Sequence, residues 1–276
     1  MIKDIVVGLA VDTGRDVAAD YAISVSAAFR AHVTAVGFAY EPMLPAAEVG
    51  NVIPFDFIDA QREANKKAAT DAIARFKEAA RLAGVSAETR LIEASAAGAG
   101  GVFGRIARSF DLSIVGQADP DAARDELLVE GALFESGRPV LVVPYIQRAG
   151  LTLERVMACW DGSRNAARAF NDAMPFLARA KAVDVVTVAG DKSKADVIEG
   201  VDIAQHLARH GLKVDLRKIT AGDTDVTNAI LSDAADRGAD FIVMGGYGHS
   251  RLREFILGGA TRGILASMTV PTLMSH

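Results

Sequence analysis

Glycine is concentrated in one stretch near the C-terminus, VMGGYGHSRLREFILGGATRG, from Val243 to Gly263. Two residues separate Gly245 from Gly248, and nine separate Gly248 from Gly258. A backbone without side chains can approach an anion closely and turn its N–H groups toward it, so the stretch indicates a phosphate cradle. It is not a P-loop, because Ile264 stands where the P-loop lysine would be.

A second group of reactive residues is WDGS, from Trp160 to Ser163. Asp161 is either a turn acid in front of a helix or a ligand contact, and the sequence leaves both interpretations open. His249 and Ser250 adjoin the glycines and could touch a phosphate, but no third group is evident to orient them as a catalytic triad would require. No catalytic residue is therefore predicted.

Three further patterns favour structural interpretations. His206 and His210 are one helical turn apart, but HLARH lacks the glutamate of a metalloprotease, so a solvated helix face is expected and no metal site. Cys159 lies in an apolar strand and is expected in the core. GAGGVFG, residues 98–104, imitates a dinucleotide fingerprint but has Phe103 in place of the third glycine, so a flexible turn is expected.

Short apolar runs rich in β-branched residues alternate with alanine-rich helical segments, and the same order occurs twice. The paired runs are DIVVGLAV and ERVMACW, HVTAVGFAY and VDVVTVAG, VSAETRLIEA and LKVDLRKITA, FDLSIVGQ and ADFIVMGG, and RPVLVVP and VPTLMSH. Such alternation is typical of a parallel sheet buried on both faces. The sequence therefore predicts two tandem, Rossmann-like α/β domains, each with five parallel strands and four helices.

Spacing places two helices of the second half. The first is expected to begin at an N-cap, Ser163, and to turn toward the sheet a face made of Ala166, Phe170, Met174 and Leu177. The second is expected to begin at Asp223 and end at Gly238, with an inward face made of Val226, Ile230 and Ala234.

The predicted domains are residues 1–148 and residues 149–276, joined near YIQRAGLTLE. The first contains an insertion, residues 41–61, in which Pro42, Pro45 and Pro54 interrupt regular structure. We expect this insertion to be a loop or lid.

Composition excludes several classes of protein. A net charge of −5 gives no electrostatic footprint for nucleic acid or for an anionic membrane. The single cysteine cannot form an internal disulfide, and no apolar run approaches the roughly 20 residues that span a bilayer. A cytoplasmic protein with no nucleic-acid or membrane partner is expected.

Three features make residues 151–276 resemble a universal stress protein domain: WDGS, the segment AGDTDVTNAILSDAADRGADFIVMG, and the glycine spacing from Gly245 to Gly258. The first half is similar mainly in architecture, so the chain resembles a tandem, two-copy member of that family. The resemblance implies an adenine nucleotide alpha hydrolase-like fold whose copies pack as a pseudo-dimer through RPVLVVP and VPTLMSH. It also implies a stress-response protein that acts by regulation or partner contact.

The resemblance further implies an adenine nucleotide, ATP or AMP, with or without magnesium, in the C-terminal domain. Asp161 would face the adenosine or, through water, a metal, and Val188 would be a second-strand contact. Met244, Gly245, Tyr247 and Gly248 would line the first turn, and Gly258, Gly259 and Ala260 would meet the phosphates. The implied site comprises Asp161, Gly162, Ser163, Val188, Met244, Gly245, Tyr247, Gly248, His249, Gly258, Gly259, Ala260 and Thr261.

The chain departs from the family pattern at Gly259, where nucleotide binders have Ser or Thr. Loss of one hydrogen bond to a charged group costs about 1.5 to 3 kcal/mol, which weakens binding about tenfold or more without abolishing it. In the first half Ala10 stands at the aspartate position and Asp119 at a glycine position, so no nucleotide is expected there, although Asp12 could replace Ala10 if the strand end is shifted.

Two alternatives to a regulatory nucleotide-binding protein stay open. One is a scaffold that has lost nucleotide and uses the insertion, with Phe55, Phe57 and Ile58, to bind another ligand or protein. The other is a weak hydrolase built on Asp161 and His249. Any ATP hydrolysis would be slow, and a homodimer of the chain is a further expectation.

Overall fold

The computed structural model describes residues 1–11, 14–42, 55–118, 123–189, 201–221, 225–247 and 259–276. The first half contains β1 (Asp4–Gly8), α1 (Val17–Phe29), β2 (His32–Tyr40), α2 (Phe55–Leu82), β3 (Ala87–Ala94), α3 (Ala96–Ala107), β4 (Leu112–Gly116), α4 (Ala123–Glu135) and β5 (Val140–Val143). The second half contains β6 (Arg155–Cys159), α5 (Arg164–Leu177), β7 (Ala182–Ala189), α6 (Val201–Arg209), β8 (Val214–Thr220), α7 (Val226–Arg237), β9 (Phe241–Gly245), α8 (Gly259–Ser267) and β10 (Thr272–Ser275).

Across the described residues the strands form one ten-stranded sheet in the order β3-β2-β1-β4-β5-β10-β9-β6-β7-β8. Neighbours within each half are parallel, whereas β5 and β10 are antiparallel, with Leu273 opposite Leu141. The predicted tandem α/β fold and the meeting of the two last strands are confirmed. Hydrogen bonds between β5 and β10 make the two predicted sheets one continuous sheet. The boundary at residues 148 and 149 stays a prediction.

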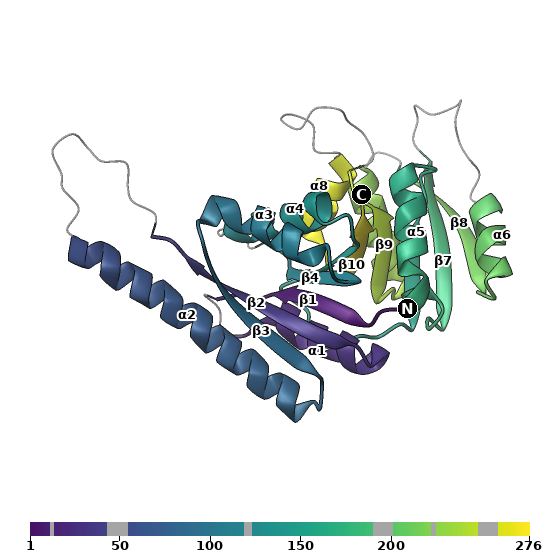
Figure 1. The fold of residues 1–276 in the computed structure, drawn as a ribbon. Coiled ribbons are helices and arrows are strands. Elements are labelled where there is room, and N and C mark those ends of the chain that lie inside the picture. The colour runs from purple at the N-terminus through teal and green to yellow at the C-terminus, as the bar shows by residue number, and fades with distance from the viewer. Residues whose placement is uncertain (12–13, 43–54, 119–122, 190–200, 222–224, 248–258) are drawn as a thin grey trace, which may run out of the picture.

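Helices cover both faces of the sheet (Figure 1). One core contains inward residues of α1, α2, α5 and α6, and the other contains those of α3, α4, α7 and α8. Alternate strand residues divide between them: in β9, Phe241 and Val243 face the first core, and Ile242 and Met244 face the second. Burial on both sides explains why central strands such as β1 and β9 are nearly continuous apolar runs, whereas the edge strands β3 and β8 are partly exposed.

The cap and inner face of α5 are as predicted. The Ser163 side chain accepts a hydrogen bond from the Ala166 N–H at 3.1 Å. Ala166, Phe170 and Leu177 are buried, and Met174 packs against the same core. The first strand of this half therefore leads directly into a capped helix.

The cap of α7 was predicted wrongly. Asp225 is its N-cap, accepting from the Asn228 N–H at 2.8 Å, and Asp223 lies outside the described residues. Val226 is 38% exposed, although Ile230 is buried as predicted. Two aspartates of equal capping ability lie two residues apart, and the helix starts at the later one. Gly238 ends the helix in the left-handed conformation, as predicted, with φ of 64°.

Two regions predicted as loops are helical. The insertion was expected to be irregular up to Gln61, but α2 begins at Phe55, directly after Pro54, and proline is compatible with a helix start. GAGGVFG lies inside α3 and is not a flexible turn. Its glycines serve helix packing, because a β-carbon on Gly100 would overlap the Leu127 carbonyl of α4, and one on Gly131 would overlap the Gly100 carbonyl.

Candidate nucleotide site

The candidate site lies at the carboxyl ends of β6, β7 and β9. Strand β6 is flanked by β7 on one side and β9 on the other, with Cys159 opposite Val186 and Ala158 opposite Val243. The strand order therefore reverses at β6, which is the position where open parallel sheets bind ligands. WDGS follows β6, and the glycine stretch begins at the end of β9.

The WDGS segment is a tight, hydrogen-bonded turn into α5. The Trp160 N–H donates to the Val186 carbonyl at 2.8 Å and keeps the segment beside β7. The Asp161 carboxylate accepts from the Ser163 N–H at 2.9 Å, and Gly162 has a φ of 75°, which favours glycine. Asp161 is thus a turn acid, and its exposed carboxylate still has acceptor capacity for a ligand.

Gly245 is glycine because α5 packs directly on the end of β9. A β-carbon on it would lie 2.6 Å from the Ala166 nitrogen and 2.8 Å from the Asn165 carbonyl carbon. Gly246 is similarly close to the first half, since its β-carbon would lie 2.9 Å from Leu133 Cδ2 of α4. These two glycines are therefore explained by close backbone packing at the entrance to the stretch, a reason that its spacing did not reveal.

Tyr247 leaves β9 in a conformation rare for residues other than glycine, with φ of 51°. Its N–H donates to Thr261 Oγ1 of α8 at 3.0 Å, and Thr261 is only 4% exposed. Burial, reinforced by the carboxylates of Glu130 and Glu126, raises the pKa of the Tyr247 phenol to about 12. The Thr261 hydroxyl is therefore a buried link between α8 and the end of β9.

Asn165 is a site residue that sequence reasoning missed. It is 4% exposed, and its side-chain amide donates to the Gly246 carbonyl at 2.6 Å and lies 3.3 Å from the Tyr247 carbonyl. A buried amide in the first turn of α5 thus holds the start of the glycine stretch. The one sequence signal for Asn165 was its position directly before Ala166, the first residue of the predicted inner face of the helix.

The N-terminus of α8 lies at the other end of the stretch. Gly259 is its first residue and is exposed, Ala260 follows, and no described atom lies within 4 Å of the place where a Gly259 β-carbon would be. Free N–H groups and the helix dipole favour an anion at such a position. The first turn of α8 therefore fits the phosphate role that was predicted for Gly259 and Ala260.

Of the remaining predicted site residues, two pack in the core and three lie outside the described residues. Met244 is 6% exposed and Val188 is partly buried, and both pack in the core on the α7 and α8 side of the sheet. Gly248, His249 and Gly258 lie outside the described residues, so their roles stay predictions.

The first half has the same strand end with different chemistry. The Leu9 N–H donates to the Val36 carbonyl at 2.9 Å, as Trp160 does to Val186, so Ala10 is the counterpart of Asp161. The Asp16 carboxylate, which caps α1, accepts from the Ala19 N–H at 2.9 Å and from the Ala10 N–H at 2.7 Å. Burial is the main cause that raises its pKa to about 6. A carboxylate therefore occupies this strand end, whereas Asp119 and Asp12 lie outside the described residues.

Other candidate residues form no second reactive site. Burial, followed by the Asp161 and Asp233 carboxylates, raises the pKa of the Cys159 thiol to about 12, so the thiol is a poor nucleophile at neutral pH. His206 and His210 are exposed, with ring centroids 4.8 Å apart. Across the part of the chain that the structure describes, no three His, Cys, Asp or Glu side chains gather as metal ligands.

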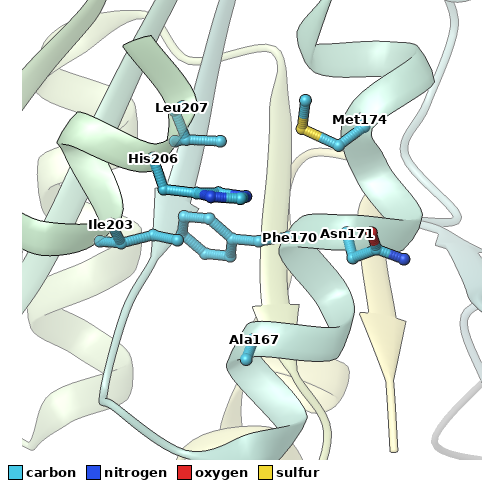
Figure 2. Close-up of a pocket in the computed structure, with 7 residues that line it drawn as sticks. All are labelled: Ala167, Phe170, Asn171, Met174, Ile203, His206 and Leu207. Atoms are coloured by element: carbon cyan, nitrogen blue, oxygen red, sulfur yellow. The ribbon is translucent and has the colours of Figure 1, made fainter. Parts of the chain in front are cut away.

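His206 also lines a pocket of about 240 Å³ between α5 and α6 (Figure 2). The other lining residues are Ala167, Phe170, Asn171, Met174, Ile203 and Leu207. Figure 2 shows the His206 and Phe170 rings directed toward one another across it. The pocket is mostly apolar and lies along α5 and α6.

Comparisons with known proteins show which family and fold the chain resembles. Residues 152–276 match the sequence model of the Universal stress protein family. The chain is 26% identical over 142 residues to the universal stress protein Slr1230 of Synechocystis sp., a match that covers 49% of this chain and 46% of that protein. The chain thus spans about half the length of the curated relative that it matches.

Two solved structures share the fold over nearly the whole chain. A universal stress protein from Archaeoglobus fulgidus has a TM-score of 0.68 at 18% identity, covering 99% of this chain and 95% of that one. A putative universal stress protein from Pseudomonas aeruginosa has a TM-score of 0.63 at 15% identity, covering 99% and 93%. The predicted resemblance to the universal stress protein family is confirmed for residues 152–276, and the two structures share the fold of the whole chain. Among the described residues, no helix combines the length and apolarity needed to cross a bilayer.

Proposed function

Since residues 152–276 are a universal stress protein domain, we propose that this half binds one adenine nucleotide, ATP or AMP, and that the first half binds none. The protein is proposed to act in the cytoplasm, in a stress response, by regulation. The observation that carries the proposal is that Asn165 of α5, two residues after the WDGS turn, and Thr261 in the first turn of α8 both bond the backbone of residues 246–247, at the end of β9 beside the strand where the order reverses.

The described residues fit an adenine nucleotide by chemistry and by space. Phosphate oxygens would accept from the N–H groups of Gly259 and Ala260 in the first turn of α8, and no described atom obstructs a ligand at Gly259. The exposed Asp161 carboxylate would accept from a ribose hydroxyl or, through water, hold magnesium. In the first half the Asp16 carboxylate already accepts hydrogen bonds from the N–H groups of Ala10 and Ala19, and its negative charge would repel a phosphate.

The first experiment is to denature the purified protein and separate the released small molecules by chromatography, then titrate ATP with magnesium into nucleotide-free protein by calorimetry. We expect about one adenine nucleotide per chain. Two per chain would contradict the assignment of the first half. No released nucleotide and no heat on titration would refute the proposal.

A charge variant tests the phosphate position directly. Gly259→Asp places a carboxylate at an exposed helix N-terminus, where it is favourable for folding but repels a phosphate. We expect it to abolish ATP binding, while Gly259→Ala, the matched control without charge, binds as the wild type does. Equal binding by both variants would place the phosphates elsewhere.

A second candidate function, partner binding, has an observation of its own. The N-terminal turns of α2 extend away from the sheet (Figure 1), and Phe57 on them is 60% exposed. Surface aromatic residues are enriched where proteins bind partners. If the chain binds no nucleotide, the scaffold function becomes the leading one, and Phe57→Ser should then weaken whichever partner co-purifies. Any ATP hydrolysis is proposed to be slow, since Ile264 stands where a P-loop lysine would be and the sequence offers no evident base for water.

A further inference from the structure

The N-terminal half contacts the chain on both sides of the glycine stretch of the C-terminal half. Before the stretch, the Phe134 ring of α4 lies 4.9 Å from the Tyr247 ring, and Leu133 fills the space beside Gly246. After the stretch, the Gln117 side-chain amide donates to the Leu265 carbonyl at 2.9 Å. Both flanks of the proposed phosphate cradle are therefore held by residues of the other half.

The contact before the stretch acts on an unfavourable backbone conformation. A bulky residue such as Tyr247 rarely adopts a positive φ, and such a conformation persists only where its surroundings determine it. The Thr261 hydroxyl fixes its N–H, and the Phe134 ring fixes its side chain. The Phe134 ring also packs at 4.9 Å against the ring of His276, whose Nδ1 lies 3.1 Å from the Gly246 carbonyl oxygen.

The contact after the stretch holds the opposite end of α8. Gln117 is 6% exposed, and its amide also donates to the Ala266 carbonyl at 3.1 Å, in the last turn of α8. Its side-chain oxygen lies 3.3 Å from the Tyr145 N–H, so the side chain itself is fixed by the first half. The helix whose N-terminus faces the proposed phosphates is thereby anchored at its C-terminus.

We propose that the N-terminal half positions the two described ends of the glycine stretch, residues 246–247 and helix α8, with Phe134 and Gln117 as the positioning residues. The inference rests on the proposed function, because the loop is the proposed phosphate cradle. It gives the first half, which lacks a nucleotide site of its own, a role in binding. When the Phe134 contact is removed, we expect Tyr247 to sample other conformations, so that only a fraction of molecules keep the end of β9 and α8 in the arrangement that binds.

The test combines Phe134→Ala, Gln117→Met and the conservative variant Phe134→Tyr in the full chain. Gln117→Met retains volume but loses the donor. If about one molecule in ten keeps a competent loop, the affinity for ATP falls about tenfold in Phe134→Ala, since apparent affinity scales with the competent fraction. Phe134→Tyr keeps the ring and should bind close to wild type. Leu82→Ala, which removes an exposed apolar side chain at the C-terminal end of α2, should leave the ATP affinity unchanged.

Hydrogen exchange supplies a readout that does not need nucleotide. We expect the Tyr247 amide to exchange faster in Phe134→Ala, while amides of β1 keep wild-type rates and show that the fold is intact. Unchanged Tyr247 exchange, or faster exchange with unchanged ATP affinity, would overturn the inference. A wild type that binds no nucleotide would refute the proposed function alone, and the exchange rates would still decide whether the first half holds the loop.

Discussion

The two halves of the sheet end their first strands in the same way and then diverge. Leu9 and Trp160 make equivalent hydrogen bonds to the neighbouring strand, of 2.9 and 2.8 Å. After that, the first half places the Asp16 carboxylate on the backbone N–H of Ala10, whereas the second half makes the Asp161 turn and caps α5 with a neutral serine. The same scaffold thus holds a buried carboxylate against the backbone at one strand end, whereas the other has an exposed carboxylate in a turn before a helix with a neutral cap.

The comparison also shows that glycines at equivalent positions of the two halves have different packing environments. Gly116 and Gly245 end equivalent strands, β4 and β9. A β-carbon on Gly116 would meet the nearest atom, Ala18 Cβ, at 4.0 Å, which is ordinary contact, whereas one on Gly245 would collide with the backbone of α5. Helix α5 therefore lies closer to its strand end than α1 does, and this closeness lets Asn165 reach the Gly246 carbonyl.

The largest expected effect comes from adding a methyl group at Gly245, compared with the same change at Gly116. We expect Gly245→Ala to lower the free energy of unfolding by about 3 kcal/mol, because backbone atoms of α5 must move. Gly116→Ala, its matched control, should cost little. Urea unfolding followed by circular dichroism measures both, and the fluorescence of Trp160, the one tryptophan, reports on the affected half. Equal stability of the two variants would mean that α5 is not packed on Gly245 as described.

A variant that is expected to gain ATP affinity, Gly259→Ser, tests whether the second half binds phosphate at this position. Gly259→Ser restores the hydroxyl that nucleotide-binding relatives are expected to have, and no described atom obstructs it. A hydrogen bond to a charged group contributes about 1.5 to 3 kcal/mol, so the ATP affinity should rise about tenfold or more. Calorimetry of Gly259→Ser beside Gly259→Ala isolates the hydroxyl. The same affinity in both variants would show that this position does not touch phosphate.

Much of the fold could be predicted because its signals are local. Buried parallel strands need continuous apolar runs, and a cap such as Ser163 is read from residue type and spacing. The helical conformation of residues 98–104 could not be read locally, since glycine disfavours a helix and only contact with Gly131 of α4 compensates. The start of α2 was missed because Pro54 signals both an interruption and a helix start.

The candidate site was predictable as a place but not as a set of contacts. The end of the first strand and the glycine spacing locate it in the sequence. The reason for Gly245, the buried role of Thr261 and the bonds of Asn165 all depend on how α5 and α8 approach β9, which involves residues far apart in the chain. Such packing distances leave no regular pattern in one sequence.

A smaller effect is expected from making the second half resemble the first at α5. Asn165 and Ala18 each lie two residues after their helix caps, Ser163 and Asp16. Asn165→Ala removes the donor to the Gly246 carbonyl and should lower the free energy of unfolding by about 1 to 2 kcal/mol. Asn171→Ala, the same change at an exposed position of α5, is the control in urea unfolding. Equal costs for the two variants would remove the structural role of Asn165.

The smallest effect is a dependence on pH that belongs to the first half. Burial chiefly, with a contribution from Asp20, raises the pKa of Asp16 from its ordinary 3.8 to about 6. A raised pKa of an acid means that the folded state prefers the protonated form, so this stability is fully present below pH 3.8 and is lost as the pH rises through about 6. Asp16→Asn keeps a capping oxygen but cannot ionise. We therefore expect the free energy of unfolding of the wild type to fall relative to that of Asp16→Asn between pH 4 and pH 7, about the range set by the Asp16 pKa. Urea unfolding at a series of pH values measures this difference. The difference between the two proteins cancels the titration of groups that they share. Parallel stability curves would show that the carboxylate is not held in the buried, N–H-bonded position that distinguishes this strand end from the one at Asp161.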